Sequence, residues 1–525
     1  MGRQRAANLV LVVGALGAAV AATRGLALGV PWADFWVFGM VVVLPAAVAL
    51  VLALVLRRGA AATRTNVALL TVATVVGLYA AELVIVLVPK RSPLTRIQRA
   101  AAEGRAFDTR LRAEIISDLR AGGTAAYMTL PSNRLRADAE RGDIEIRVDG
   151  RRLVPLSNVS NRTVVHCNET GETSVFRTDE FGYNNPNGAW SGPLDVALLG
   201  DSFVQGACVG PSQTIAAQLR RHLPRTVALA LDDFGPLSML GALREYLPQV
   251  RPRDVFWVYY EWNDLRDLTI ERRSATLRAY LETDRIQGLA ENQTVIDSVL
   301  ADYIDRYVAD EAGRASPVAR RGAGRGPSIT RSVASWLKLY SVRELLGLAD
   351  MSDRIGDCCD IDTFAAILAR ARESVESWGG QLHFVYLPAA LRYYQPASVL
   401  LDHAMRNRRR VLGVVRDLDL PIVDLHRAFR ESANPAGLFV DERSHLTADG
   451  YRAVADAVIR HLEQYPRMPD GVRQPTRPTP APRAVAATAP ARDESPDVRV
   501  PPALQDANGV GALEHFRLGH HHRIQ

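Results

Sequence analysis

Apolar residues are unevenly distributed, which divides the chain into a strongly apolar first ninety residues and a longer part of ordinary polarity. Three apolar stretches cover residues 7–23, 35–56 and 67–88, and the first can be extended to residue 30. Each stretch approaches the roughly 20 residues that a helix needs to cross the hydrocarbon core of a bilayer. The pattern therefore predicts a membrane anchor of three transmembrane helices in residues 1–89.

Basic residues flank these stretches on both sides. Arg3 and Arg5 precede the first stretch, which also fits a secretory signal peptide, but the two further stretches favour a retained helix. With the amino terminus in the cytoplasm, three spans place the rest of the chain outside it. Lys90 and Arg91 directly follow the third stretch and count against this orientation. Charge alone therefore does not decide the orientation.

From residue 191 onward, short apolar runs alternate with amphipathic stretches. Runs that predict buried strands cover residues 196–199, 227–231, 255–260, 382–387 and 421–425. Helices are expected at 214–223, 237–247, 363–378, 399–418 and 448–465. Short buried strands with helical crossovers predict a parallel sheet covered on both faces. We expect an α/β domain over 191–465 with a helical insertion at about 270–360.

The segments on either side of this domain have other patterns. Residues 90–190 predict a lead-in of mixed helix and strand, with a helix over 95–120 and a hairpin turn at Asp149-Gly150. Residues 315–327 are rich in Gly, Arg and Pro and predict a loop within the insertion. After residue 465 the chain is rich in Pro, Arg and Ala, so 466–525 is predicted to be a disordered tail.

Composition narrows the function classes further. The formal charge is +6, but nearly all of the positive charge is arginine and no basic block with interleaved aromatics stands out, so nucleic-acid binding is not expected. No two of the four cysteines form a C-x-x-C pair, which argues against a structural zinc site. No cofactor and no metal are implied.

A candidate nucleophile follows the first predicted strand of the domain. Gly200-Asp201-Ser202 comes directly after that strand and before a predicted helix. Ligands of open α/β sheets bind at the carboxyl ends of the strands, and a helix amino terminus favours a developing oxyanion. The same tripeptide also fits a plain strand-to-helix turn with a polar cap, so further segments are needed to decide.

Two such segments lie near the ends of later strands. Asn263 follows the third strand, at the same edge of the sheet as Ser202, where its carboxamide can donate to an oxyanion. His445 lies on a loop just before an amphipathic helix and is preceded by carboxylates. A histidine in that setting is a candidate general base.

Gly200-Asp201-Ser202, Asn263-Asp264 and the His445 loop, in this order, resemble the blocks of the SGNH/GDSL hydrolase superfamily. The resemblance covers roughly residues 180–465 and implies a flavodoxin-like three-layer α/β fold. It also implies a nucleophile at Ser202, a base at His445, and oxyanion donors at Ser202 N–H and Asn263 Nδ2.

Three departures from the family pattern affect the site. Glu261 stands where the third block usually has glycine. In the second block the glycine that should donate an oxyanion N–H falls on Asp233, with Gly235 two residues later. Both Glu442 and Asp441 precede His445 closely enough to be its orienting acid; spacing favours Glu442 and residue type favours Asp441.

The resemblance implies a membrane-anchored serine esterase that acts on acyl groups of envelope glycan or lipid, with the bilayer as its partner. An O-acyltransferase with the same residues is an alternative, and it would need a membrane partner that supplies the acyl donor. A catalytically silent glycan-binding module is a second alternative, favoured by the irregular Asp233 segment. An envelope role is our reason to expect an inner-membrane, multi-pass protein with its soluble domain in the periplasm or otherwise outside the cytoplasm.

An oxidising compartment would make Cys167 and Cys208 candidates for a disulfide. Both flank the strand that leads to Ser202, and their bond would close a loop of roughly 40 residues. Cys358 and Cys359 are adjacent and are not expected to pair with each other, because a vicinal disulfide is strained.

Overall fold

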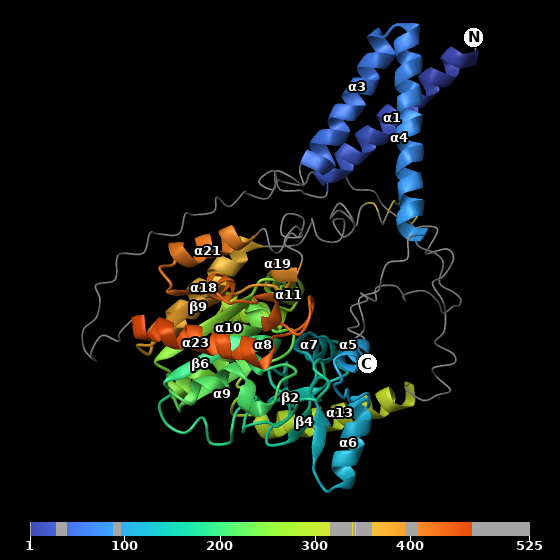
Figure 1. Ribbon diagram of the computed structural model, residues 1–525. Helices are drawn as coiled ribbons and strands as arrows, with labels where there is room; N and C mark the ends of the chain where they lie inside the picture. Colours follow the sequence, from blue (N-terminus) through green and yellow to red (C-terminus); the bar gives the residue numbers. More distant parts are fainter. Residues whose placement is uncertain are drawn as a thin grey trace, which may run out of the picture. The chain divides into compact units, whose positions relative to one another are not determined.

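A five-stranded parallel sheet forms the centre of the α/β part (Figure 1). The computed structural model describes residues 2–27, 39–87, 96–314, 360–394 and 407–464, with the single residues 336, 339 and 342. The strands are β6 (Val196–Gly200), β7 (Thr226–Ala230), β8 (Asp254–Tyr260), β9 (Gln381–Leu387) and β10 (Ile422–Asp424). Their order is β10-β9-β8-β6-β7, which is the flavodoxin-like order. All five lie where the apolar runs predicted strands.

Helices cover both faces of the sheet and create three layers (Figure 1). Because side chains alternate along a strand, Leu199, Trp257 and Phe384 share one face. They belong to one apolar core with residues of α10 (Pro236–Val250), α18 (Ile361–Glu376) and α21 (Arg408–Asp417). On the opposite face, Phe256 and His383 contact His461 of α23 (Ala448–Gln464). Burial on both faces explains why the strands are continuous apolar runs.

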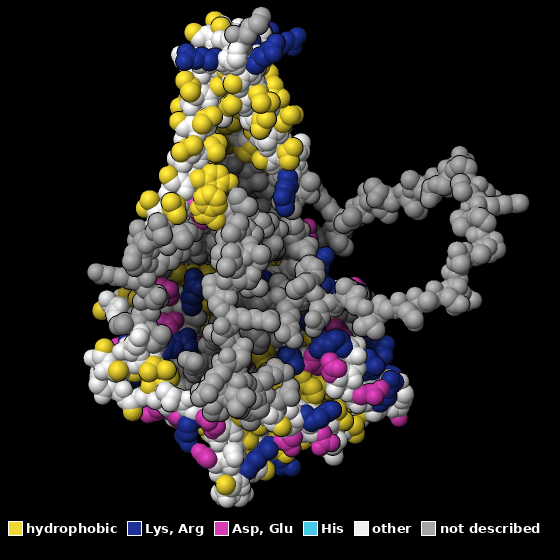
Figure 2. Space-filling model, turned by 90° about the vertical axis from the view of Figure 1, so that its right-hand side faces the viewer, with side chains coloured by type: hydrophobic (Ala, Val, Ile, Leu, Met, Phe, Trp, Pro, Cys, Tyr) yellow, Lys and Arg dark blue, Asp and Glu magenta, His cyan; other side chains and the backbone are white. Residues whose placement is uncertain are grey.

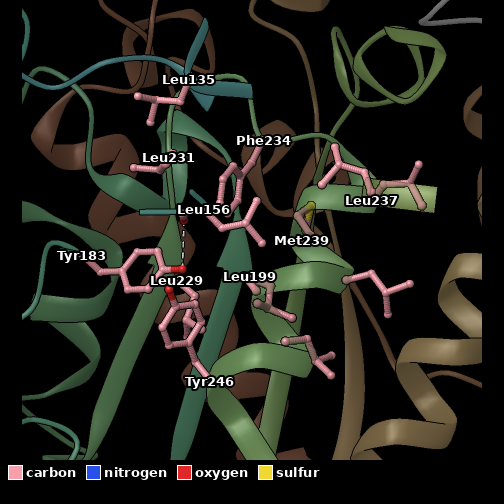
Figure 3. Close-up of a cluster of buried hydrophobic side chains, with 14 of the residues drawn as sticks. Leu135, Leu156, Tyr183, Leu199, Leu229, Leu231, Phe234, Leu237, Met239 and Tyr246 are labelled. Atoms are coloured by element: carbon pink, nitrogen blue, oxygen red, sulfur yellow. Dashed lines mark hydrogen bonds between the residues drawn. The ribbon is translucent and has the colours of Figure 1, made fainter. Parts of the chain in front are cut away.

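The lead-in is packed against the sheet as part of the same apolar core. Its strands are β1 (Ala126–Met128), β4 (Thr163–Val165) and β5 (Val175–Arg177), with a separate hairpin of β2 (Ile146–Val148) and β3 (Arg151–Leu153). Figure 3 shows Leu135, Leu156 and Tyr183 of the lead-in among Leu199, Leu229 and Phe234 of the α/β part. The Tyr183 hydroxyl donates to the Leu156 carbonyl at 3.0 Å, so this polar atom is satisfied inside the core.

The predicted single helix over 95–120 is two helices, α5 (Arg96–Ala102) and α6 (Arg112–Ala121). Gly104 has φ +67°, and the N–H of Arg105 donates back to the Ala100 carbonyl, which ends α5. The predicted hairpin is confirmed, because Asp149 and Gly150 both have positive φ between β2 and β3.

Three helices account for the described part of the insertion. They are α11 (Asp264–Glu271), α12 (Ala275–Glu282) and α13 (Gln293–Arg314). Two shorter helices, α8 (Ser202–Gln205) and α9 (Ile215–Leu219), follow β6. The predicted loop at 315–327, the adjacent pair Cys358 and Cys359, residues 399–406 of a predicted helix and the tail at 466–525 lie outside the described residues.

The amino-terminal part contains α1 (Gly2–Ala27), a π-helical turn (Gly39–Val43), α3 (Leu44–Arg58) and α4 (Ala61–Leu87). Two helices, at residues 2–24 and 61–85, are long and apolar enough to cross a membrane by length and composition. Within the part of the chain that the structure describes, two of the three predicted spans are thus found, and the middle stretch appears as the π-helical turn followed directly by the 15-residue helix α3. Figure 2 shows apolar side chains over this part, with basic side chains at one end.

Candidate active site

Ser202 lies on a sharp turn between β6 and α8. A Cβ at Gly200 would meet the Val204 side chain at 2.4 Å, so only glycine allows so tight a turn. The Asp201 carboxylate accepts a hydrogen bond from Phe203 N–H at 3.0 Å and caps α8. Ser202 is 9% exposed and lies at the carboxyl edge of the sheet, where ligands bind in this class of fold.

His445 lies on a loop that is closed by its own hydrogen bonds. Val440 N–H donates to the His445 carbonyl at 3.0 Å, and Asp441 N–H donates to Ser444 Oγ at 2.6 Å. The loop holds His445 Nε2 at 2.8 Å from Ser202 Oγ. At this distance the imidazole can accept the hydroxyl proton. The structure thus brings together the two residues predicted as nucleophile and base.

The carboxylate beside the other ring nitrogen belongs to Glu169, which lies upstream of the segment that resembles the SGNH/GDSL superfamily and was not predicted. Glu169 Oε2 lies 3.1 Å from His445 Nδ1 and accepts a hydrogen bond from the His445 backbone N–H at 2.9 Å. The predicted acids, Glu442 and Asp441, are not at this position. The Asp441 carboxylate is held instead by Arg96 Nε at 2.9 Å and by Arg443 N–H at 2.9 Å. The expectation that the acid comes from the His445 loop is therefore corrected.

Arg96 links the two carboxylates. Its Nη2 lies 3.1 Å from Glu169 Oε1, while its Nε binds Asp441. Arg96 is the first residue of α5 and lies nine positions after Leu87, the last residue of α4. The chain that leaves the apolar helices therefore contributes directly to the environment of Glu169.

Cys167 and Cys208 form a disulfide across a sequence separation of 41, which confirms the predicted pair. Cys167 comes two residues before Glu169, and Cys208 comes six residues after Ser202. The bond fastens the Glu169 loop to the segment that carries Ser202. This pairing was the one signal in the sequence that could have located Glu169.

The disulfide also bears on metal binding. Ligand atoms of Glu169, Cys208 and His445 lie within 4.8 Å of one another. Metals bind the cysteine thiolate, and the Cys208 sulfur is engaged in a disulfide. This group of residues is therefore unsuited to a metal ion while the disulfide is intact.

The predicted oxyanion donors differ in whether their N–H groups already have an acceptor. Asn263 Nδ2 donates to Asp201 Oδ2 at 3.2 Å, which places the carboxamide beside the nucleophile turn. Asp233 has φ +60°, a left-handed conformation that aspartate tolerates better than most residues. Neither Ser202 N–H nor Asp233 N–H donates to another residue in the described part of the chain. Both amides are therefore available to a ligand.

Gly235, the other predicted donor, does not offer its amide. Its N–H donates to Glu271 Oε1 at 2.9 Å, and the same carboxylate accepts from the N–H groups of Leu237 and Ser238. Glu271 of α11 thus caps the amino terminus of α10. The assignment of Gly235 as an oxyanion donor is corrected, because this cap consumes its N–H.

Several carboxylates determine the electrostatics of the site. Burial alone would lower the pKa of His445, but Glu169, followed by Asp232 and Asp201, raises it to about 9. Burial alone would raise the pKa of Glu169, but His445 and Arg96 lower it to about 2. The imidazole is therefore strongly biased towards its charged form, and its base form increases as the pH rises towards 9.

Glu261, which stands at the expected glycine of the third block, has a structural role. Its buried carboxylate accepts hydrogen bonds from Ala389 N–H at 2.9 Å, from Arg392 Nε at 2.6 Å and from the Tyr386 hydroxyl. This fastens the end of β8 to the segment after β9. Next to it, aromatic rings border the site: the ring centroid of Phe203 lies 4.3 Å from that of Tyr260 and 4.9 Å from that of His445.

Comparisons with known proteins add the following. No protein-family model and no curated protein match the chain. Among solved structures, a lipase/acylhydrolase from Enterococcus faecalis is similar at 11% identity, covering 52% of this chain and 99% of that one, with a TM-score of 0.28. A protein assigned as an acylhydrolase from Bacteroides fragilis NCTC 9343 is similar at 11% identity, covering 53% of this chain and 94% of that one, with a TM-score of 0.28.

Proposed function

We propose that the chain is a serine esterase of the SGNH type, with Ser202 as nucleophile, His445 as base and Glu169 as orienting acid. The observation that carries the proposal is the continuous contact of the three side chains, with 2.8 Å from Ser202 Oγ to His445 Nε2 and 3.1 Å from His445 Nδ1 to Glu169 Oε2. A nucleophile, a base within hydrogen-bond reach and a third group that orients the base are the constituents of acyl-transfer catalysis.

In the proposed mechanism, the ester is hydrolysed in two steps, acylation and deacylation of Ser202. In the first, His445 takes the Ser202 proton as the oxygen attacks the ester carbonyl. Ser202 N–H, Asp233 N–H and Asn263 Nδ2 stabilise the oxyanion that forms. Collapse of this intermediate expels the alcohol, which receives the proton from His445, and leaves the acyl group on Ser202. In the second step, water attacks the acyl-enzyme by the same route and releases the carboxylic acid.

Membrane attachment and an extracytoplasmic site belong to the same proposal. Two helices with the length and composition of membrane spans support the attachment. The disulfide between Cys167 and Cys208 supports an oxidising compartment, because such bonds are rare in the cytosol. Acyl groups of envelope glycan or lipid are the substrates available to an enzyme in that position.

Short acyl esters and a fusion reporter test the two parts separately. Purified full-length protein should hydrolyse p-nitrophenyl acetate or butyrate, and Ser202→Ala should not. For the location, a reporter that is active only outside the cytoplasm, fused after Gln464, should be active. A silent reporter of proven expression would reverse the orientation and leave the catalytic assignment unaffected.

A further inference from the structure

A cavity lined by charged residues borders the site on the side of Glu169. Its volume is about 310 Å³, and its lining includes three arginines and two glutamates, namely Arg96, Arg99, Arg105, Glu103 and Glu169. Glu169 contacts the Nδ1 side of His445, whereas Ser202 contacts the Nε2 side. The cavity therefore lies beyond the imidazole from the nucleophile. Its volume is at the lower end of the range found for small-molecule sites.

The three arginines of this cavity differ in how their charge is compensated. Arg96 is paired with Glu169 and Asp441, and Arg105 is paired with Glu103. Arg99 donates a single hydrogen bond, to the Val440 carbonyl at 3.3 Å, and pairs with no carboxylate among the described residues. Most of its five N–H donors therefore remain available.

An uncompensated guanidinium in a cavity is a recognition element for an oxyanion. Arginine binds phosphate through two parallel hydrogen bonds. A planar carboxylate needs one guanidinium, whereas the oxygens of a tetrahedral phosphate can be approached from several sides. The uncompensated guanidinium of Arg99, with the donor groups of Arg96 and Arg105 around the same cavity, therefore favours phosphate.

We propose that this cavity binds a phosphate group of the substrate while the ester carbonyl of the same molecule lies at Ser202. The proposal rests on the esterase function and specifies its substrate class: acyl esters that carry a phosphate. His445 lies between Ser202 and the Glu169 carboxylate that lines the cavity, and 24% of its side chain is exposed, so a substrate that reaches both would lie across this exposed part. A phospholipid and a water-soluble phosphorylated ester share this chemistry.

The test compares two esters that differ only in the phosphate. Full-length protein in detergent is assayed with 1-butyrylglycerol and with 1-butyrylglycerol 3-phosphate, and the ratio of their kcat/KM values measures the preference. We expect the phosphate ester to be preferred. Arg99→Gln should lower that ratio about 10- to 100-fold, the range for losing a hydrogen bond to a charged group. The matched control, Arg427→Gln, removes the same charge from a side chain that is 85% exposed and should keep the ratio.

A binding measurement separates failure of this proposal from failure of the esterase function. Calorimetric titration of Ser202→Ala with glycerol 3-phosphate needs no turnover, and binding should disappear when Arg99→Gln is added. Binding without hydrolysis of either ester would reject the esterase and keep the phosphate site. Hydrolysis without preference and without binding would reject the phosphate site alone, as would an equal loss of preference in Arg427→Gln.

A final arm distinguishes the source of the phosphate. Vesicles of phosphatidylglycerol and of phosphatidylcholine are offered beside the soluble phosphate ester, and release of fatty acid is followed. Turnover of either phosphate-bearing substrate that depends on Arg99 supports the proposal. Turnover confined to vesicles identifies a lipid, and turnover confined to the soluble ester identifies a phosphorylated small molecule or glycan.

Discussion

Glutamine in place of Glu169 keeps the size of the side chain but removes the charge beside His445 Nδ1. The loss acts on the imidazolium that forms when His445 takes the Ser202 proton. The pKa of His445 is about 9 against an ordinary 6.5, which corresponds to about 3 kcal/mol in favour of the charged ring. Glu169 contributes more than any other charge to this rise. Losing most of this stabilisation of the charged ring should slow turnover about 100-fold.

A second effect adds to the first. Glutamine can donate its own N–H to Nδ1, which leaves the ring proton on Nε2 and prevents the ring from acting as a base. Loss of a triad carboxylate costs on the order of 10⁴ in turnover when both effects operate. A fall of about 100-fold would therefore indicate lost charge alone, and a larger fall would indicate the wrong tautomer as well.

The assay measures kcat on p-nitrophenyl butyrate between pH 6 and pH 10 for Glu169→Gln beside Asp441→Asn and Glu442→Gln. The Glu169 variant should be severely impaired. The pH at which its remaining activity begins to increase should be lower than in the wild type, because without Glu169 the pKa of His445 is lower. The other two variants should stay near the wild-type rate. Normal turnover of Glu169→Gln together with a large loss in either of the others would refute our assignment of the acid.

Four further outcomes are expected. Ser202→Ala should abolish ester hydrolysis while leaving the circular dichroism spectrum unchanged, and equal turnover of variant and wild type would reject the nucleophile. Asn263→Ala should lower kcat on the order of 100- to 1000-fold with little change in KM; a normal kcat would reduce Asn263 to a turn residue. The kcat/KM of the wild type should rise with pH until about 9, because only neutral His445 is a base; a limb that ends near pH 6.5 would contradict the charged environment. Replacing Cys167 and Cys208 by serine should lower the free energy of unfolding by about 4 kcal/mol, measured in urea, because the bond closes a loop across a separation of 41 residues; an unchanged urea midpoint would show that the bond does not stabilise the fold.

The sheet and the Ser202–His445 contact could be predicted because their signals are local. Each strand is a short apolar run between turns. Because helices cover both faces of the parallel sheet, nearly every strand residue is buried and apolar. Gly200 is required by the tight turn before Ser202, so that turn is readable in the sequence. The five strands therefore lie at the expected positions, although helix ends differ by several residues.

Glu169 and Gly235 could not be predicted because their partners are distant in sequence. Glu169 contacts His445 across 276 residues, and apart from the predicted cysteine pair beside Glu169 nothing in the sequence indicates that contact. Gly235 N–H is consumed by Glu271, which lies on the following helix of the fold. Tertiary packing determines which backbone amides and carboxylates are left without a partner in the protein. The apolar and polar pattern of a single segment does not predict these long-range contacts.

The short connection between α4 and Arg96 has a kinetic consequence. Leu87 and Arg96 are nine positions apart, so even a fully extended chain keeps Arg96 within roughly 30 Å of the end of α4. In the membrane-anchored enzyme proposed here, this short connection would keep the catalytic groups close to the bilayer surface. Substrates in the same membrane would be met by lateral diffusion, at an effective concentration set by how densely they populate the surface. The rate would then follow the mole fraction of substrate in the membrane rather than its bulk concentration.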